Sequence, residues 1–114
     1  MPLSIEEVAW KLYNAAKLGA PSRGKDFDLR YEDVLALTRK GRCAMSGIFL
    51  DTNPKPPQGP DLPWRASLDR IDNSIGYYPD NIRVVCKIYN SAKYIWTDAD
   101  VLRLCQAVAR KGVR

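Results

Sequence analysis

A set of polar side chains between positions 67 and 93 has the residue types needed to bind a metal ion or a phosphate. The set comprises Asp69, Arg70, Asp72, Asn81, Asn90 and Lys93. Carboxylate and amide oxygens are hard ligands that suit Mg²⁺ rather than zinc, and an arginine holds a phosphate through its planar fork of donors. The same residues also allow a purely structural interpretation, in which Asp69 pairs with Arg70 or Arg83 and the Asp-Asn pairs at 72–73 and 80–81 form turns.

The chain contains no histidine. This absence excludes nucleophilic catalysis of the Ser-His-Asp and Cys-His types, histidine metal ligands and histidine general bases. Any proton transfer in a reaction at this set would need another base.

The polar set must be positioned by a hairpin followed by a helix. Residues 66–71 and 82–86 are predicted to be strands that pair across the loop at 73–81. The side-chain period of two puts Asp69 and Ile71 on one face of the first strand and Arg70 on the other. In the following helix Asn90 and Lys93 are three residues apart, so they share one face across the hairpin. Apolar residues repeat along this helix at helical spacing, namely Ile88, Ala92 and Ile95.

Three further helices are expected around this unit. A capping box of Ser4 and Glu7 begins a helix that ends at Gly19, and a second helix covers Tyr31 to Arg39. A last helix follows Thr97, and we expect it to pack on the back of the hairpin through apolar residues at i, i+3, i+4 and i+7, namely Val101, Leu104, Cys105 and Val108. Two apolar segments around positions 46–47 predict another short hairpin. Residues 53–63 contain five prolines and predict an exposed loop.

The length of 114 residues is that of one domain. We expect a single α+β domain at 1–114, with a helical part at 1–40, a ββα core at 41–96 and a helix at 97–114.

Apolar residues make up 46% and charged residues 27%, as in soluble globular proteins. No apolar run is long enough to cross a bilayer and no signal peptide is evident, so an intracellular, cytoplasmic location is expected. The net charge of +5 is compatible with a polyanionic partner. The three cysteines form no C-x-x-C pair, so no structural zinc is expected.

The order of several short motifs resembles the HNH endonucleases, which belong to the His-Me finger or ββα-metal group. The motifs are Cys43-Ala44-Met45-Ser46-Gly47, Leu68-Asp69-Arg70-Ile71-Asp72, Gly76-Tyr77, Asp80-Asn81-Ile82, Val84-Val85-Cys86 and Asn90. The lead-in Phe27-Asp28-Leu29 is similar to that of phage-type members, and the resemblance covers residues 23–96. It implies a small ββα-metal finger, embedded among additional helices, that acts on double-stranded DNA, in the host cytoplasm if phage-encoded.

The resemblance also implies roles for individual residues. Asp69 and Asn90 match the family's metal ligands, and Asn81 matches the asparagine that closes the hairpin loop and holds the general base. Mg²⁺ or another divalent cation is then the expected cofactor, which would stabilise charge on the scissile phosphate and the leaving oxygen.

The chain departs from the family at the general base. The family's histidine directly follows the aspartate, and Arg70 stands at that position. An arginine stays protonated and cannot accept a proton from water, so Arg70 is expected to anchor a phosphate. Asp72 is the nearest candidate base, because it occupies the last position of an Asp-Arg-x-His motif found in a related nuclease group. An aspartate is a poor base near neutral pH unless its pKa is raised.

Three functions are therefore open. The first is a metal-dependent DNA endonuclease with a substituted base, and the second is a catalytically silent HNH-fold module that binds DNA or protein. DNA phosphates would be contacted by basic residues of the hairpin and of the helices that follow, namely Arg70, Arg83, Lys87, Lys93, Arg110 and Lys111. The third is a protein-interaction factor with an exposed aromatic patch of Trp64, Tyr77, Tyr78, Tyr94 and Trp96.

Overall fold

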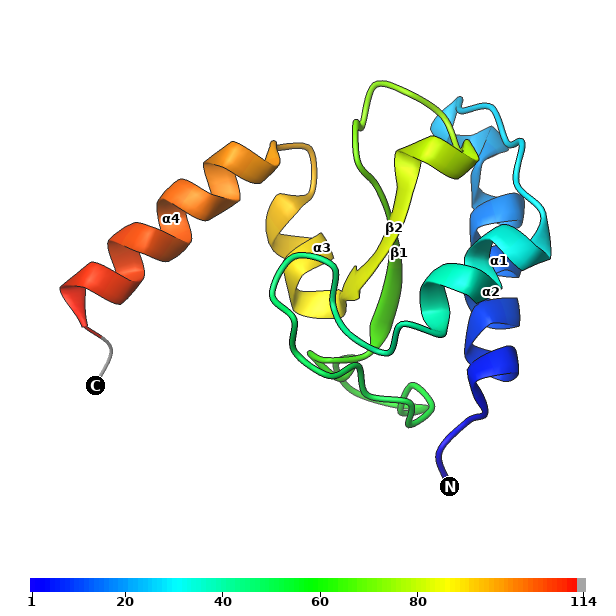
Figure 1. Ribbon diagram of the computed structural model, residues 1–114, viewed down its shortest axis with the longest axis horizontal. Helices are drawn as coiled ribbons and strands as arrows, with labels where there is room; N and C mark the ends of the chain where they lie inside the picture. Colours follow the sequence, from blue (N-terminus) through cyan, green and yellow to red (C-terminus); the bar gives the residue numbers. More distant parts are fainter. Residues whose placement is uncertain (113–114) are drawn as a thin grey trace.

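A computed structural model describes residues 1–112 of the chain (Figure 1). Its elements in order are α1 (Ile5–Gly19), the 3₁₀ turn η1 (Pro21–Arg23), α2 (Tyr31–Thr38), β1 (Ala66–Arg70), the 3₁₀ turn η2 (Pro79–Asn81), β2 (Ile82–Cys86), α3 (Lys87–Lys93) and α4 (Asp98–Lys111). The α+β class with a two-stranded antiparallel hairpin and surrounding helices is confirmed. Within the described residues no helix has both the length and the apolar character to cross a membrane. The three-part division of a single domain stays a prediction, and its last two residues, 113–114, lie outside the described part.

Helices α1 and α2 pack against one face of the hairpin and supply its main apolar core (Figure 1). Helix α1 begins at the expected capping box, in which the Glu7 N–H donates to Ser4 Oγ and the Ser4 N–H donates to Glu7 Oε1. One face of α1 then buries small residues, which lets α2 and the hairpin approach closely. The resulting cluster contains Ala9, Ala16, Ala20, Leu29, Val34, Tyr77 and Ile82.

The hairpin pairs the two segments that the sequence predicts to be strands. Strands β1 and β2 are antiparallel, with Asp69 opposite Arg83 and Arg70 opposite Ile82. Strand β1 ends one residue earlier than expected, although the Ile71 N–H still donates to the Asn81 carbonyl at 2.9 Å. Four of the five side chains of β2 are buried, so this strand fixes the position of the hairpin between the helices.

The segment at 42–50 forms a single bridge between Arg42 and Phe49 rather than two strands. Its tight turn includes Gly47 at a φ of 74°, a left-handed conformation that favours glycine. The Ala44 N–H donates to the Val84 carbonyl at 3.0 Å, so the turn is docked on β2 and needs no partner strand of its own. The proline-rich stretch at 53–63 is largely exposed and contains no helix or strand, as predicted.

The two C-terminal helices use different faces from those that the apolar spacing indicated. In α3 the apolar residues Ile88 and Ala92 are exposed, and the buried residue is Lys93. The helix ends at Lys93, so Ile95 lies beyond it and is also exposed. Helix α4 extends away from the hairpin instead of covering its back (Figure 1). Only Val101 of its predicted stripe is buried, while Leu104, Cys105 and Val108 are exposed. The expectation that α4 packs on the hairpin is therefore wrong, because a capped amphipathic pattern specifies a helix without specifying a surface that covers it.

Candidate functional site

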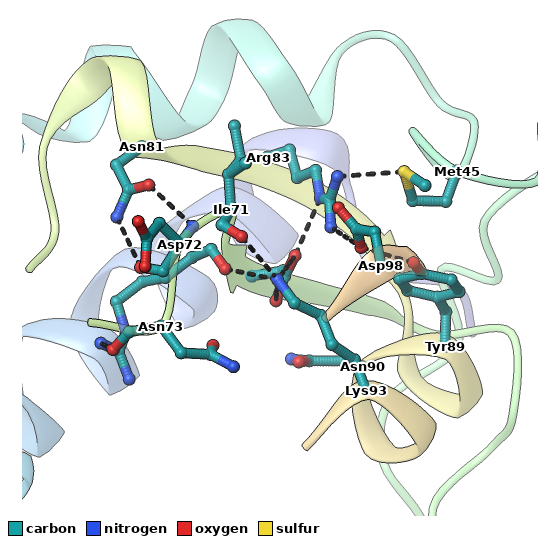
Figure 2. Close-up of polar contacts among 12 residues, drawn as sticks. Met45, Ile71, Asp72, Asn73, Asn81, Arg83, Tyr89, Asn90, Lys93 and Asp98 are labelled. Atoms are coloured by element: carbon teal, nitrogen blue, oxygen red, sulfur yellow. Dashed lines mark hydrogen bonds and ion pairs between the residues drawn. The ribbon is translucent and has the colours of Figure 1, made fainter. Parts of the chain in front are cut away.

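Asp69 is a buried carboxylate that forms ion pairs with Arg83 and Lys93. Figure 2 shows these two partners together with Asp98 and Tyr89. Strand β1 turns it toward α3 and β2, where Lys93 Nζ donates to Oδ1 at 3.2 Å and to Oδ2 at 3.1 Å. Arg83, directly opposite on β2, donates from Nε to Oδ2 at 2.8 Å. The structural interpretation of the sequence, in which Asp69 pairs with Arg83, thus describes part of this cluster.

Lys93 connects α3 to the end of β1 and the start of the hairpin loop. Its side chain is 1% exposed, and Nζ also donates to the carbonyls of Arg70 at 2.7 Å and Ile71 at 3.0 Å. All the donors of the ammonium are therefore directed inward. The expectation that Lys93 contacts nucleic acid does not fit this position, because a phosphate would have to displace several buried hydrogen bonds.

Arg83 extends the cluster to the start of α4. Nη2 donates to Asp98 Oδ1 at 2.6 Å, and the Tyr89 hydroxyl donates to the same oxygen at 2.5 Å. The hydrogen bond from Arg83 is the main reason why the pKa of Asp98 lies below its ordinary value, while burial raises the pKa of Tyr89. Arg83, like Lys93, is thus bonded to carboxylates inside the protein. Its contact with DNA stays a prediction, and a phosphate would have to displace these bonds.

Arg70 braces the loop that follows β1. Its Nη1 donates to the carbonyls of Asn73 at 2.6 Å and Ile75 at 2.9 Å, and the guanidinium lies 5.3 Å from the centre of the Tyr77 ring. These contacts use one of the three guanidinium nitrogens. The rest of the fork is available for a bidentate contact with an anion.

Asn81 closes the hairpin loop from the other side. Its Oδ1 accepts from the Asp72 N–H at 2.9 Å, and its Nδ2 donates to the carbonyls of Asp72 at 3.1 Å and Gly76 at 2.9 Å. The amide is buried and bonded at both ends. It therefore holds the loop in shape and does not face a ligand.

The condition that would make Asp72 a general base is not met. Its carboxylate accepts from the Ser74 N–H at 2.9 Å and the Ser74 hydroxyl at 2.7 Å, and these bonds lower its pKa. A lowered pKa makes the carboxylate a weaker proton acceptor. Asp72 also lines a separate hollow beside the start of α4, together with Trp96 and Asp98.

One groove between β1, α3 and the loop gathers the remaining candidates. It has a volume of about 490 Å³ and is lined by Asp69, Arg70, Tyr77, Lys87 and Asn90, among others. Four of these were singled out from the sequence, and the fold brings them together. Asn81, Arg110 and Lys111 do not line this groove, and the last two lie on the projecting helix α4.

The oxygen donors in the groove fit a divalent cation only in part. Asn90 Nδ2 donates to Ser67 Oγ at 2.7 Å, and no described residue donates to its amide oxygen, which is left for a ligand. Asp69 accepts three hydrogen bonds from Arg83 and Lys93, and a carboxylate has about four acceptor positions. Residues 1–112 contain no cluster of three or more Cys, Asp or Glu side chains placed to hold a metal. The donor set suits Mg²⁺, which is commonly held by one or two protein oxygens plus substrate phosphates.

The fold of the chain is similar to that of a protein of known structure. The chain superposes on the rare-cutting HNH restriction endonuclease PacI with a TM-score of 0.63, over 93% of this chain and 82% of that one, at 22% sequence identity. The fold is HNH-like. No protein-family model matches the chain, and no curated protein matches it. The ββα arrangement expected from the short motifs is thereby confirmed at the level of the fold.

The sequence did not place Tyr77 or Arg23 in the HNH-like groove. Tyr77 was expected in an exposed aromatic patch, but its side chain is 6% exposed and lies under Arg70 in the groove. Arg23, in the turn after α1, lines the same groove. It belongs to the charged connector at 22–28, for which the sequence allowed a solvated loop or a phosphate contact, and only the tertiary fold brings it beside Arg70. The proposed aromatic patch is thus broken at Tyr77, although Trp64, Tyr94 and Trp96 are exposed.

Proposed function

We propose that this chain is an HNH-like DNA endonuclease that depends on a divalent cation. The observation that supports the proposal most strongly is that Asp69, Arg70 and Asn90 line one groove at the junction of the hairpin and α3. These are a carboxylate, a planar cation and an amide, the side chains needed to hold a metal ion and a phosphate next to each other. The HNH-like fold provides the framework in which such a groove performs phosphodiester hydrolysis.

Each residue in the groove has a distinct part in this proposal. Asp69 and Asn90 hold the cation through their side-chain oxygens, and Arg70 binds a non-bridging phosphate oxygen with the part of its guanidinium that does not brace the loop. The bound cation supplies Lewis-acid stabilisation of charge on the phosphate and the leaving oxygen. Asn81 keeps the loop closed, so that Arg70 stays at the edge of the groove.

The local charges make metal binding depend on the substrate. Asp69 and Asp98 are balanced by Arg83 and Lys93, so the cluster is neutral before any cation arrives. A divalent ion beside Asp69 would be repelled by the two positive side chains on the same carboxylate. A DNA phosphate in the groove offsets this repulsion, so we infer that the cation and the DNA bind together.

Asp72 stays the candidate proton acceptor that the sequence offers. The hydrogen bonds from Ser74 lower the pKa of its carboxyl, so it is a weak base, and its side chain lies in another hollow. Tyr77 lies beside Arg70 in the groove and supports its guanidinium.

Nicking of supercoiled plasmid DNA tests the proposal. The protein is incubated with plasmid in Mg²⁺ or Mn²⁺, and the same reactions are repeated with excess EDTA. We expect nicking that requires the metal and that falls on the order of 10²-fold in Asn90→Ala, because the substitution removes a proposed ligand. Asn14→Ala, which changes an asparagine of α1 outside the groove, is the matched control and should nick like the wild type. Wild-type protein that never nicks DNA, or an Asn90→Ala variant of undiminished activity, would contradict the proposal.

A catalytically silent DNA-binding module is the second candidate function. It is favoured by the engagement of Asp69, whose carboxylate is already held by two cations. In this case the wild type binds DNA without nicking it, and Arg70→His, which introduces an imidazole base at the family's position, gains metal-dependent nicking. An inactive wild type together with an inactive Arg70→His variant would leave DNA binding as the only supported activity.

A further inference from the structure

The groove that holds the proposed site continues into a second one of similar volume. The second groove has a volume of about 540 Å³ and runs between α1, the proline-rich loop, β1 and α3. The two grooves share several lining residues, among them Arg23, Leu68, Tyr77, Lys87 and Asn90. They therefore form one continuous channel on the surface, which we call the α1–α3 channel.

The lining of this channel is strongly basic. Its cationic side chains come from α1, η1, the proline-rich loop, residues 65–70 in and just before β1, and α3. They are Lys11, Arg23, Lys55, Arg65, Arg70 and Lys87. The acidic residues of the lining are Asp61 and Asp69. Both are already paired, Asp61 with Arg65 at 2.7 Å and Asp69 with Arg83 and Lys93. In the part of the chain that the structure describes, Lys11, Arg23, Lys55 and Lys87 form no ion pair with protein carboxylates.

This distribution differs from the set of basic residues predicted from the sequence. Arg83 and Lys93 are turned inward on Asp69, and Arg110 and Lys111 lie on the projecting helix α4. Of the predicted set, Arg70 and Lys87 line the channel. The other exposed cations of the channel are Lys11, Arg23 and Lys55. The sequence allowed a phosphate contact at the connector that contains Arg23, and it did not connect Lys11 or Lys55 with the site.

We propose that the sugar–phosphate backbone of one DNA strand lies along the α1–α3 channel, held by Lys11, Arg23 and Lys87. Arg23 and Lys87 line both grooves, so they stand where the strand passes from the outer part of the channel to Asp69 and Arg70. Lysine and arginine contacts of this kind position the nucleic acid and carry no base recognition. The proposal rests on the proposed function for its choice of ligand, and it adds the path that the substrate follows.

The counterion physics of DNA gives the proposal a quantitative signature. Each phosphate that a protein cation neutralises releases condensed counterions, so the slope of log K against log salt changes by about 0.9 per contact for duplex DNA. Removing three such contacts should reduce the slope by about 2 to 3 and should weaken binding by roughly 10²-fold near 0.1 M salt. A loss of affinity caused by net charge alone would be the same wherever the three cations are removed, and a misfolded variant would be recognised by its loss of structure.

The test compares two triple variants with the same change in charge. The channel variant is Lys11→Ala, Arg23→Ala and Lys87→Ala, and the control variant is Lys17→Ala, Lys40→Ala and Arg103→Ala. The control residues are exposed and line neither groove. Binding to a fluorescent 20-base-pair duplex and to its single strand is measured in EDTA, so that no cleavage interferes, at a series of salt concentrations. Circular dichroism and the unfolding midpoint of each variant confirm that it is folded.

The outcomes separate this proposal from the proposed function. We expect the channel variant to lose roughly 10²-fold in affinity and about 2 to 3 units of salt slope, while the control variant retains most of the wild-type affinity. Equal losses in both triple variants would overturn the proposed path, because they would show a response to net charge only. Wild-type protein that binds neither duplex nor single strand, in EDTA and again with Mg²⁺ present, would instead overturn the proposed DNA activity itself. Tighter binding of the single strand than of the duplex would keep the path and change the form of the ligand.

Discussion

Replacement of Lys93 by methionine tests whether the buried cluster around Asp69 holds the hairpin and α3 together. Methionine keeps most of the apolar stem of lysine and removes the ammonium. The variant loses both hydrogen bonds from Lys93 Nζ to Asp69, and the carbonyls of Arg70 and Ile71 lose the bond that they accept from the same ammonium. Breaking a buried ion pair by removing one partner costs about 3–5 kcal/mol. Because Arg83 remains on Asp69, we expect a loss near the lower end, about 3 kcal/mol.

Chemical unfolding measures this loss directly. The free energy of unfolding of Lys93→Met is compared with that of the wild type in urea, followed by circular dichroism, and Lys40→Met serves as the control at an exposed lysine. The control should change stability by no more than about 0.5 kcal/mol. Since a domain of this size has about 5–15 kcal/mol in total, the difference is readily measured. A loss below about 1 kcal/mol in Lys93→Met would refute the reasoning, because it would show that the ammonium is not needed inside the protein.

Two further predictions concern the edges of the site. Asp98→Asn should lower the free energy of unfolding at pH 7. Because the pKa of Asp98 is lowered in the folded state, its contribution to stability is lost on protonation, so the difference from the wild type should shrink as the pH falls below the ordinary carboxyl pKa of 3.8. A difference that is the same at pH 7 and pH 3 in urea unfolding would contradict this. Gly19→Ala would place a methyl group 2.1 Å from the present position of Arg23 Nη1, so it should displace this guanidinium without changing the net charge. We expect a several-fold lower affinity for duplex DNA with no loss of stability, since alanine is the better helix former, and unchanged affinity would show that Arg23 does not bind DNA from this position.

Local signals were sufficient for most of the secondary structure. The capping box at Ser4 and Glu7 predicted the start of α1, and the apolar segments at 66–71 and 82–86 predicted the two strands of the hairpin. Spacing also placed Asn90 and Lys93 on one face of α3, as the structure confirms by joining them to Ser67 and Asp69. These features depend on residues close in sequence or on one short hairpin, so tertiary packing had little opportunity to override them.

The predictions that differ from the structure share a physical cause. The type of a side chain does not show which other residues the tertiary fold will pack around it. Lys93 was expected among the side chains that contact DNA phosphates, whereas Asp69 and two backbone carbonyls hold its ammonium inside the protein. The stripe of α4 was expected to pack because apolar residues usually do. The α1–α3 channel could not be predicted because its cations come from five segments that are brought together only by the tertiary fold.

Plasmid nicking by the wild type and by Asn90→Ala, with and without EDTA, tests the central claim most directly. The account predicts nicking in Mg²⁺ or Mn²⁺ that EDTA abolishes and that Asn90→Ala reduces on the order of 10²-fold, with Asn14→Ala unchanged. Nicking that continues in EDTA, or that is equal in the wild type and Asn90→Ala, would contradict the assignment of the groove as a metal-dependent nuclease site.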